Sequence, residues 1–227
     1  MNVHSKILVH WTGKKDNENQ AEEVRASLYV ERLKDYYNHG LYIRRTEEAV
    51  LRRLKIKNLL RLCFTEIRLS QAENHSQKYG KLGVGFSREY ILDRSGRPVI
   101  YIPFEAENSL LEESLRRSYE NSRNYADIHK PLTYVLAFIK RMWNEYNEPY
   151  YDEMEWRIVY DENPGNPYFR KGKDDGVYRF AFDASDVKVI IFPDEKTKLH
   201  SLDDTEIQIN FSRHLPIMAT LEECKNF

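Results

Sequence analysis

Short apolar runs bounded by turn residues predict strands toward both ends of the chain. The first run ends at the polar pair Thr12-Gly13, and the final third of the chain is rich in similar runs. A glycine-punctuated segment at Gly80–Phe86 fits a strand or a turn. The expected strands are Lys6–His10, Cys63–Thr65, Val99–Ile102, Glu155–Tyr160, Val177–Phe182, Val187–Phe192 and Glu206–Phe211.

Apolar positions at helical spacing predict helices through the middle of the chain. Val24, Leu28, Leu33 and Tyr37 are four or five residues apart, and Gly40 supplies a C-terminal stop. Strands at both ends with helices between them indicate one α+β domain spanning residues 1–227, without an internal repeat. The expected helices are Ala21–Tyr37, Thr46–Leu60, Ser87–Leu92 capped by Ser87, Ser109–Tyr119, and Leu132–Trp143 with Pro131 in its first turn.

Composition narrows the class of protein. The chain is 41% apolar and 13% aromatic, enough for a sizeable core, and 35 basic against 36 acidic residues leave a net charge of −1. This balance excludes a globally basic nucleic-acid coat, although a local patch stays open. The chain shows no apolar run long enough to span a bilayer, and its two cysteines lie far apart. Its first residues lack the pattern of a signal peptide, so we expect none. We therefore expect a cytoplasmic protein with no membrane partner.

Several kinds of chemistry lack their sequence signatures. The seven histidines are not spaced as metal ligands, so we expect no metal site. A Gly-x-Ser-x-Gly nucleophile elbow is missing, and Cys63 fits a buried small hydrophobe better than a nucleophile. Gly80, Gly83 and Gly85 reverse the order of a dinucleotide fingerprint. They indicate a bent strand in which backbones approach closely or, as the alternative, the wall of a ligand cleft.

The segment Val9–Gly13 is more informative. In a strand, His10 and Thr12 project to the same face, and Gly13 lets the backbone approach a flat ring. An imidazole and a hydroxyl together suit a ribose diol or a carboxamide. The alternative is a strand end whose polar side chains satisfy a turn.

A pair of carboxylates precedes a predicted strand. Glu153 and Glu155 are two residues apart, so in extended chain they share one face. Such a pair can stabilise a developing cation and orient an incoming nucleophile. The alternative is an acidic strand end in which Glu155 or Arg157 forms a cross-strand ion pair.

Basic residues supply two further candidates. Arg68 could hold a phosphate through its planar guanidinium, or it is one of many exposed arginines. A basic stretch on the expected second helix could steer a nucleic acid, or it is a solvated helix face. Its members are Arg44, Arg45, Arg52, Arg53, Lys55, Lys57 and Arg61.

Taken in order, these segments resemble the AbiGi-type abortive phage-resistance proteins. The resemblance extends from about Val9 to Arg157, with a weaker continuation through Asp183 to Pro193. It implies a bacterial defence or toxin–antitoxin setting and an antitoxin component. The motifs that carry it are His10-x-Thr-Gly13, Gly40-Leu41, Cys63-Phe-Thr-Glu66, Tyr79-Gly-x-x-Gly-Val-Gly-Phe86, Arg97-Pro-Val-x-Tyr101 and Glu155-Trp-Arg157.

The same order is similar, more distantly, to DarT-like ADP-ribosyltransferases. That resemblance implies a split β-sheet core with a helical middle section and NAD as substrate. It assigns the early His-x-Thr to the nicotinamide end of NAD, an arginine to the phosphates, and a glutamate opening a late strand to catalysis. An aromatic such as Tyr29, Trp11 or Phe86 would stack on nicotinamide. The NAD-binding set is then His10, Thr12, Gly13, Arg68 and Tyr29, and the catalytic carboxylates are Glu155 and Glu153.

Three functions follow from these resemblances. The first is NAD-dependent ADP-ribosylation of nucleic acid, or secondarily of protein, as an antiphage response. The second is a non-catalytic antitoxin or adaptor that binds and neutralises a cognate toxin, and the third is an interaction domain without a pocket. An enzyme requires His10, Thr12 and Glu155 around one cleft, whereas a binder requires an exposed apolar patch.

Overall fold

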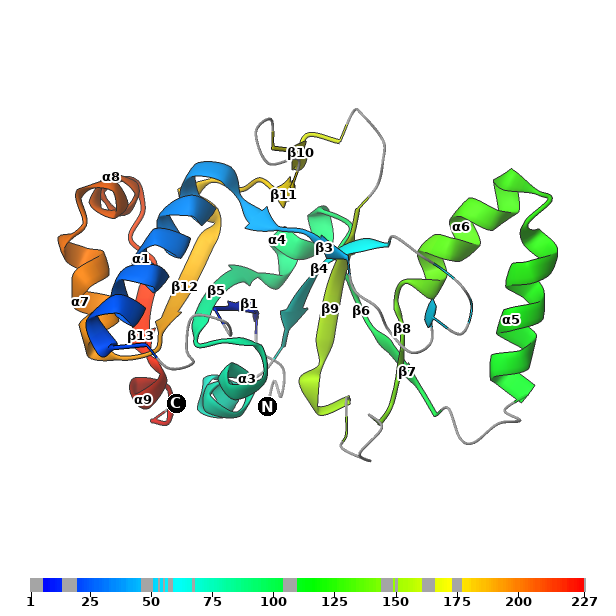
Figure 1. Ribbon diagram of the computed structural model, residues 1–227, viewed down its shortest axis with the longest axis horizontal. Helices are drawn as coiled ribbons and strands as arrows, with labels where there is room; N and C mark the ends of the chain where they lie inside the picture. The colour runs from blue at the N-terminus through cyan, green and yellow to red at the C-terminus, as the bar shows by residue number, and fades with distance from the viewer. Residues whose placement is uncertain are drawn as a thin grey trace.

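The computed structural model describes residues 6–13, 20–45, 51–52, 54, 56, 59–66, 68–103, 110–143, 149, 151–160, 166–172 and 177–226. It is a mixed α/β structure built around one large mixed sheet (Figure 1). The strands are β1 (Ile7–Thr12), β2 (Leu41–Tyr42), β3 (Arg44–Arg45), β4 (Leu60–Thr65), β5 (Leu82–Ser87), β6 (Arg97–Pro98), β7 (Ile100–Ile102), β8 (Ile139–Arg141), β9 (Glu155–Val159), β10 (Phe169–Lys171), β11 (Tyr178–Phe180), β12 (Val187–Phe192) and β13 (Ile217–Thr220). The helices are α1 (Glu22–His39), α3 (Ala72–Tyr79), α4 (Arg88–Asp93), α5 (Leu110–Ser122), α6 (Ala126–Leu136), α7 (Glu195–Asp203), α8 (Thr205–Arg213) and α9 (Leu221–Cys224).

The strands of the large sheet follow the order β13-β12-β5-β1-β4-β9-β6, and β3 pairs with β4. The β12–β13 pair is parallel, and the other pairs in this sheet are antiparallel. Two smaller sheets accompany it: β10-β11-β2 and the parallel pair β7-β8. The chain therefore combines strands from both ends of the sequence in one sheet, as the α+β pattern predicts.

Alternate residues of the central strands face two separate cores. On one face, Leu8, Val84 and Ile190 belong to the main core, which contains Tyr29, Val30 and Leu33 of α1. On the other face, the strand residues of a smaller core pack with α3 and α9, and that core is made of Val9, Trp11, Ala72, Val189, Ile191, Ala219, Leu221 and Cys224. Burial on both faces fixes the register of these strands, because a shift of one residue would exchange the two cores.

The sheet opens between β1 and β4. All six residues of β1 pair with β5, whereas its pairing with β4 is confined to Val9 and Thr65. Beyond this pair, the His10 side chain joins the two strands: its Nδ1 lies 2.9 Å from the carbonyl oxygen of Cys63. The opening leaves room beside His10 that side chains from several elements surround.

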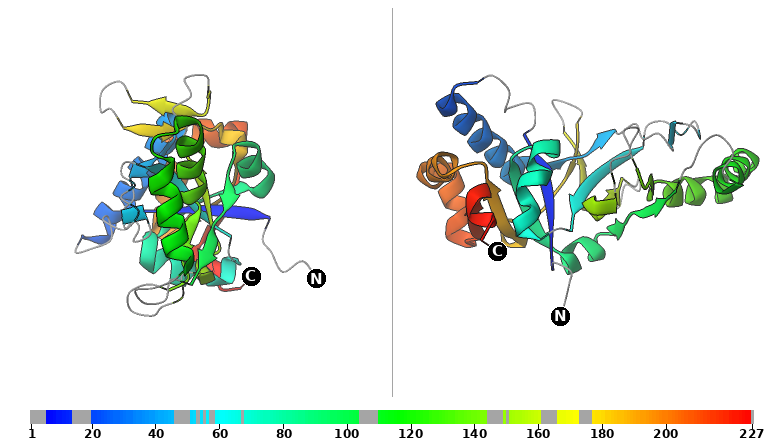
Figure 2. Two further views of the ribbon diagram at one scale, coloured as in Figure 1. Left: turned by 90° about the vertical axis from the view of Figure 1, so that its right-hand side faces the viewer. Right: turned by 90° about the horizontal axis from the view of Figure 1, so that it is seen from below.

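Helices gather at opposite ends of the molecule. α1, α7 and α8 lie together beside β12 and β13, whereas α5 and α6 pack on each other at the far end, beyond β7 and β8 (Figures 1 and 2). Tyr119 of α5 and Leu136 of α6 share a small core with Ile139 of β8. Among the described residues, no helix combines the length and the apolar character needed to cross a membrane.

Most of the predicted elements are confirmed. The first strand, the first helix, the strand at Cys63–Thr65 and the strands at Gly80–Phe86, Glu155–Tyr160, Val177–Phe182 and Val187–Phe192 correspond to β1, α1, β4, β5, β9, β11 and β12. Ser87 caps α4, since its Oγ accepts the backbone N–H of Tyr90 at 3.1 Å. The helix predicted at Ser109–Tyr119 is α5, and the strand predicted at Val99–Ile102 is β7, which begins at Ile100.

The predicted helix at Leu132–Trp143 is wrong. The helix α6 ends at Leu136, and Pro131 is its sixth residue rather than part of its first turn. Ile139 follows the apolar stripe of the helix in sequence, but it lies in β8 and pairs with Ile100 of β7. Strand pairing between distant segments outweighs the local periodicity here.

The predicted strand at Glu206–Phe211 is also wrong, because this segment lies in α8. Ile207 and Phe211, four residues apart, are buried, and Ile209 between them is 57% exposed. Asp204 caps the helix by accepting the backbone N–H groups of Glu206 and Ile207. The alternation of apolar and polar residues is typical of a strand. In a helix, however, residues four apart lie on the same face, so Ile207 and Phe211 are buried there together.

The predicted second helix, Thr46–Leu60, is wrong at its end, because Leu60 begins β4. Of the basic stretch assigned to this helix, Arg44 and Arg45 form β3, and Arg61 lies in β4. Residues 46–50 and the basic residues at 53, 55 and 57 lie outside the described residues.

Candidate functional site

A cavity of about 310 Å³ occupies the opening of the sheet between β1 and β4. His10, Thr12 and Glu155 all line it. His10 and Thr12 lie in β1, whereas Glu155 lies in β9, which is separated from β1 by β4 and is distant from it in sequence. The cavity is at the lower limit of volumes typical of small-molecule sites. Its lining residues are Val9, His10, Trp11, Thr12, Gly13, Arg32, Tyr42, Arg44, Arg61, Leu62, Cys63, Phe64, Thr65, Tyr79, Lys140, Glu153 and Glu155.

His10 enters the cavity as a neutral imidazole. Burial, together with the nearby Arg44 and Arg32, lowers its pKa from 6.5 to about 4, although the hydrogen bond to the Cys63 carbonyl acts in the opposite direction. Because a carbonyl oxygen only accepts, Nδ1 donates its proton to Cys63 and Nε2 carries the lone pair. His10 can therefore accept a hydrogen bond from a ligand hydroxyl or amide.

Thr12 and Gly13 follow His10 along the cavity wall. The hydroxyl of Tyr36 donates to Thr12 Oγ1 at 2.7 Å, which fixes the threonine rotamer. Gly13 has φ +90°, and a Cβ built on it would lie 2.4 Å from Cε1 of Tyr29. The ring of Tyr29 thus fills the space beside Gly13 in the core, where it is 2% exposed and outside the cavity lining.

The predicted role of Tyr29 as a stacking residue for nicotinamide does not fit this position, because its ring faces are covered by protein. Phe86 is likewise fully buried in the main core. Trp11, the third aromatic considered, does line the cavity, and its Nε1 donates to Thr65 Oγ1 at 2.9 Å. Of the aromatics named from the sequence, Trp11 is the one that the structure brings to the site.

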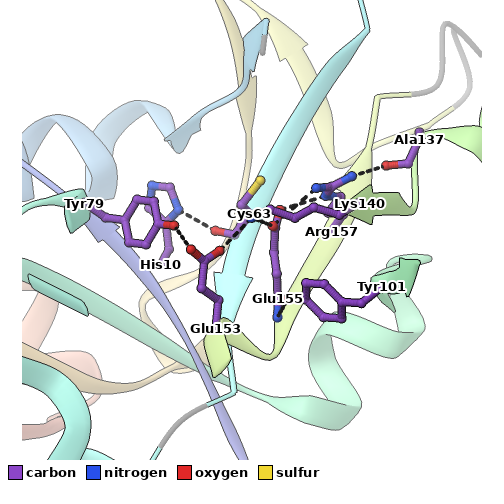
Figure 3. Close-up of polar contacts among 9 residues, drawn as sticks. All are labelled: His10, Cys63, Tyr79, Tyr101, Ala137, Lys140, Glu153, Glu155 and Arg157. Carbon is purple, nitrogen blue, oxygen red and sulfur yellow. Dashed lines mark hydrogen bonds and ion pairs between the residues drawn. The ribbon is translucent and has the colours of Figure 1, made fainter. Parts of the chain in front are cut away.

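A buried network of charges forms the opposite wall (Figure 3). Lys140 of β8 donates from Nζ to Glu153 Oε2 at 2.6 Å and to Glu155 Oε2 at 2.7 Å. Arg157 donates from Nε to Glu155 Oε1 at 2.7 Å, and its Nη1 donates to the carbonyl oxygen of Ala137. Both glutamates expected from the sequence therefore reach the site, together with two cations.

Glu153 and Glu155 lie side by side for a reason other than strand alternation. Glu153 ends a 3₁₀ turn, Met154 has φ +41°, and β9 begins only at Glu155. A positive φ is costly for a residue with a side chain. This left-handed residue brings the Glu153 carboxylate to the same ammonium that Glu155 contacts.

The charge states of this wall follow from its contacts. Burial raises the pKa of Glu155, but Arg157 and Lys140 outweigh burial and hold that pKa well below its ordinary value. Burial lowers the pKa of Lys140, and Glu155 and Glu153 more than compensate, so the net change is upward. Near neutral pH, Glu155 is thus a carboxylate and Lys140 an ammonium.

Cys63 lies in the cavity wall as a thiol. Burial raises its pKa to about 12, and the Glu155 carboxylate raises it as well. A thiolate is the reactive form of cysteine, so this pKa leaves Cys63 unreactive near neutrality. Cys63 lies in a strand, as predicted, but its side chain is only partly buried and lines the cavity, so the prediction of a buried small hydrophobe is wrong.

Arg68, the predicted phosphate ligand, is not at the cavity. It is exposed and precedes the 3₁₀ turn Leu69–Gln71. Three other arginines line the cavity instead: Arg32 from α1, Arg44 from β3 and Arg61 from β4. Together with Lys140 they give the lining four cationic side chains against two carboxylates, a balance that attracts anions.

Sequence reasoning missed Lys140, Tyr79 and Arg32 as cavity residues. Tyr79 donates its hydroxyl to Glu153 Oε1 from the end of α3. Nothing in the local sequence marks Lys140 or Arg32, because each reaches the cavity through the packing of its element, whereas Tyr79 opens the motif Tyr79-Gly-x-x-Gly-Val-Gly-Phe86 and that motif was the available signal. Among the described residues, no three His, Cys, Asp or Glu side chains are grouped so that they could hold a metal ion.

Comparison with known protein families gives one match. It matches the family described as "Putative abortive phage resistance protein AbiGi, antitoxin" over residues 42–193. No curated protein and no solved structure matches it significantly, and none of these comparisons supports the DarT-like resemblance. Because the family match covers more than half of the 227 residues, the chain belongs to the AbiGi family of abortive phage-resistance proteins, which are described as antitoxins.

Proposed function

We propose that the chain acts in phage resistance by binding NAD in the cavity between β1, β4 and β9 and transferring its ADP-ribosyl group to a nucleic acid. One observation carries the proposal: His10, Thr12 and Glu155 line a single cavity, as the transfer requires. The family match supports the setting in phage defence.

The cavity offers complementary groups to each part of NAD. Arg32, Arg44 and Arg61 supply positive charge for the pyrophosphate. His10 Nε2 accepts from a ribose hydroxyl or from the carboxamide, while Thr12 and Gly13 lie beside it. Trp11 also lines the cavity, and it is the aromatic residue that we assign to nicotinamide.

The chemistry follows from the ionised Glu155. As the C–N bond to nicotinamide breaks, its electron pair leaves with nicotinamide and the ribose C1′ becomes cationic. The Glu155 carboxylate stabilises this cation, and a nucleophile of the acceptor then bonds to C1′ and loses its proton to solvent. Lys140 and Arg157 offset part of the carboxylate's charge, so we expect modest turnover.

Expression in bacteria and label transfer test this proposal. We expect the wild-type chain to arrest growth and to transfer radiolabel from the adenylate part of NAD to nucleic acid. Glu155→Gln should abolish both, whereas Glu89→Gln, an exposed glutamate of α4, should change neither. Harmless expression together with no label transfer and no nicotinamide release would reject the transferase.

A non-catalytic antitoxin is the second candidate, favoured by the family description and by the two cations that already hold Glu155. In this case the chain binds a cognate toxin, and the carboxylate serves stability. Coexpression with the toxin separates the two candidates: neutralisation that persists in Glu155→Gln favours the antitoxin.

A further inference from the structure

Lys140 connects the two glutamates of the cavity, and the proposed reaction gives no role to this connection. Its ammonium lies 2.6 Å from Glu153 Oε2 and 2.7 Å from Glu155 Oε2. All three side chains are buried. A cation shared in this way offsets the repulsion that two neighbouring buried carboxylates would otherwise have.

The two glutamates depend on Lys140 to different degrees. Glu155 has a second cation in Arg157, and its backbone N–H donates to the hydroxyl of Tyr101 at 2.9 Å. Glu153 accepts from the Tyr79 hydroxyl, which is neutral because burial, followed by Glu153 itself, raises the pKa of Tyr79.

Two further titratable groups among the described residues interact with the Glu153 charge: His75, whose ring stacks near Tyr79 on α3, and Tyr101, whose pKa is raised chiefly by burial. Burial lowers the pKa of His75, so it is neutral near pH 7. Within the described part of the chain, Lys140 is therefore the cation that contacts Glu153 directly.

Lys140 reaches this position through an element outside the main sheet. It lies on β8, which follows α6 and pairs in parallel with β7, so that Tyr101 and Lys140 are register partners. Ala137, just before β8, accepts from Arg157. Tyr101 and Lys140 of the short β7–β8 sheet thus contact Glu155, and Ala137 just before β8 contacts Arg157.

We propose that Lys140 is a positioning residue: its ammonium bridges Glu153 and Glu155 and thereby keeps the Glu155 carboxylate in place at the cavity. Its catalytic consequence rests on the proposed function, whereas its effect on the two carboxylates does not. Without Lys140, the two neighbouring buried carboxylates lose the cation that they share, so their repulsion displaces Glu155.

The test uses the full chain and the variant Lys140→Met, which keeps a long apolar side chain. In the wild type we expect the kcat for nicotinamide release to be nearly independent of pH between about 5.5 and 8. In Lys140→Met, kcat should fall by roughly tenfold or more as the pH rises across this range, because the repulsion between the two carboxylates is greatest when both are charged. Lys130→Met, at an exposed position on α6, is the matched control and should behave as the wild type.

A second substitution separates positioning from mere structure. Glu153→Gln in the Lys140→Met background removes the repelling charge, so we expect it to restore kcat and the flat pH profile. A loss of kcat that is equal at every pH and is not restored by Glu153→Gln would overturn the proposal.

Thermal unfolding without NAD gives a readout independent of turnover. In Lys140→Met the two neighbouring carboxylates have lost their shared cation, so their mutual repulsion destabilises the folded state more as the pH rises. We expect Tm, relative to the wild type, to fall between about pH 5.5 and 8, and Glu153→Gln to remove the fall. If Tm differs between Lys140→Met and the wild type by the same amount at about pH 5.5 and pH 8, the proposal is overturned even if the wild type cleaves NAD. A wild type that leaves NAD intact rejects the transferase, and this Tm series still decides the role of Lys140.

Discussion

At the scale of single residues, His10 links the stability of the fold to pH. Its pKa of about 4 in the folded chain lies below the value near 6.5 expected in the unfolded chain. Between these two values the unfolded state binds the proton and the folded state does not, so the stability rises with pH across this window. The contribution is present above about pH 6.5 and is lost as the pH falls through about 4.

Urea unfolding of the wild type and of His10→Gln at about pH 7 and pH 4.5 measures this contribution. Glutamine keeps a donor for the Cys63 carbonyl but does not titrate in this range. We expect the wild type to lose up to about 3 kcal/mol more than the variant between the two pH values. Equal losses would mean that His10 is not held neutral by the fold.

Local strand geometry brings some of the predicted residues to the site, whereas other positions depend on contacts between distant segments. His10 and Thr12 share a face because the period of a strand fixes it, and this was predictable from sequence. The prediction for Arg68 rests on its guanidinium chemistry and on the DarT-like resemblance, and the fold leaves this residue outside the cavity. Lys140 was not predictable, because the pairing of β7 with β8 across two helices brings it to the carboxylates.

At the scale of elements, α8 shows why alternation misleads. Ile207 is fully buried and Ile209 is 57% exposed, although a strand would place both on one face. We expect Ile207→Ala to reduce the free energy of unfolding by about 2–5 kcal/mol and Ile209→Ala to change it by less than about 0.5 kcal/mol. Similar losses for both variants, measured by urea unfolding, would contradict the helix.

The glycines of β5 belong to the packing of the sheet rather than to the cavity. A Cβ on Gly85 would lie 2.4 Å from Val189 Cγ1 and 2.9 Å from Ile7 Cγ2. Of the two interpretations of this segment, the strand is confirmed, and neither Gly83 nor Gly85 lines the cavity. The predicted close approach of two backbones is wrong, because the atoms nearest to both glycines are side-chain carbons of neighbouring strands.

Substitution of Gly85 tests this packing. We expect Gly85→Ala to cost about 1–3 kcal/mol of unfolding free energy through overpacking. Val189→Ala removes the nearest carbon, so the double variant should be more stable than the sum of the two single losses predicts. Strict additivity would show that the two side chains do not compete for the same space.

At the scale of the whole molecule, a chain with a net charge of −1 places an excess of positive charge in one cavity. The sheet splits between β1 and β4, and the cavity, His10 and the glutamates all lie at that split. The α+β class was predictable because the strand and helix patterns are local. The order of the strands was not, since it depends on which distant edges pair.

The central claim is that this cavity is a site for NAD, and calorimetric titration of NAD onto the purified chain tests it most directly. Arg44 and Arg45 are neighbours in β3, but only Arg44 lines the cavity. We predict saturable binding of one NAD per chain. Arg44→Ala should weaken it by roughly tenfold or more, the equivalent of one charge-assisted hydrogen bond, and Arg45→Ala should leave it unchanged. No binding by the wild type, or equal weakening by both variants, would contradict the account.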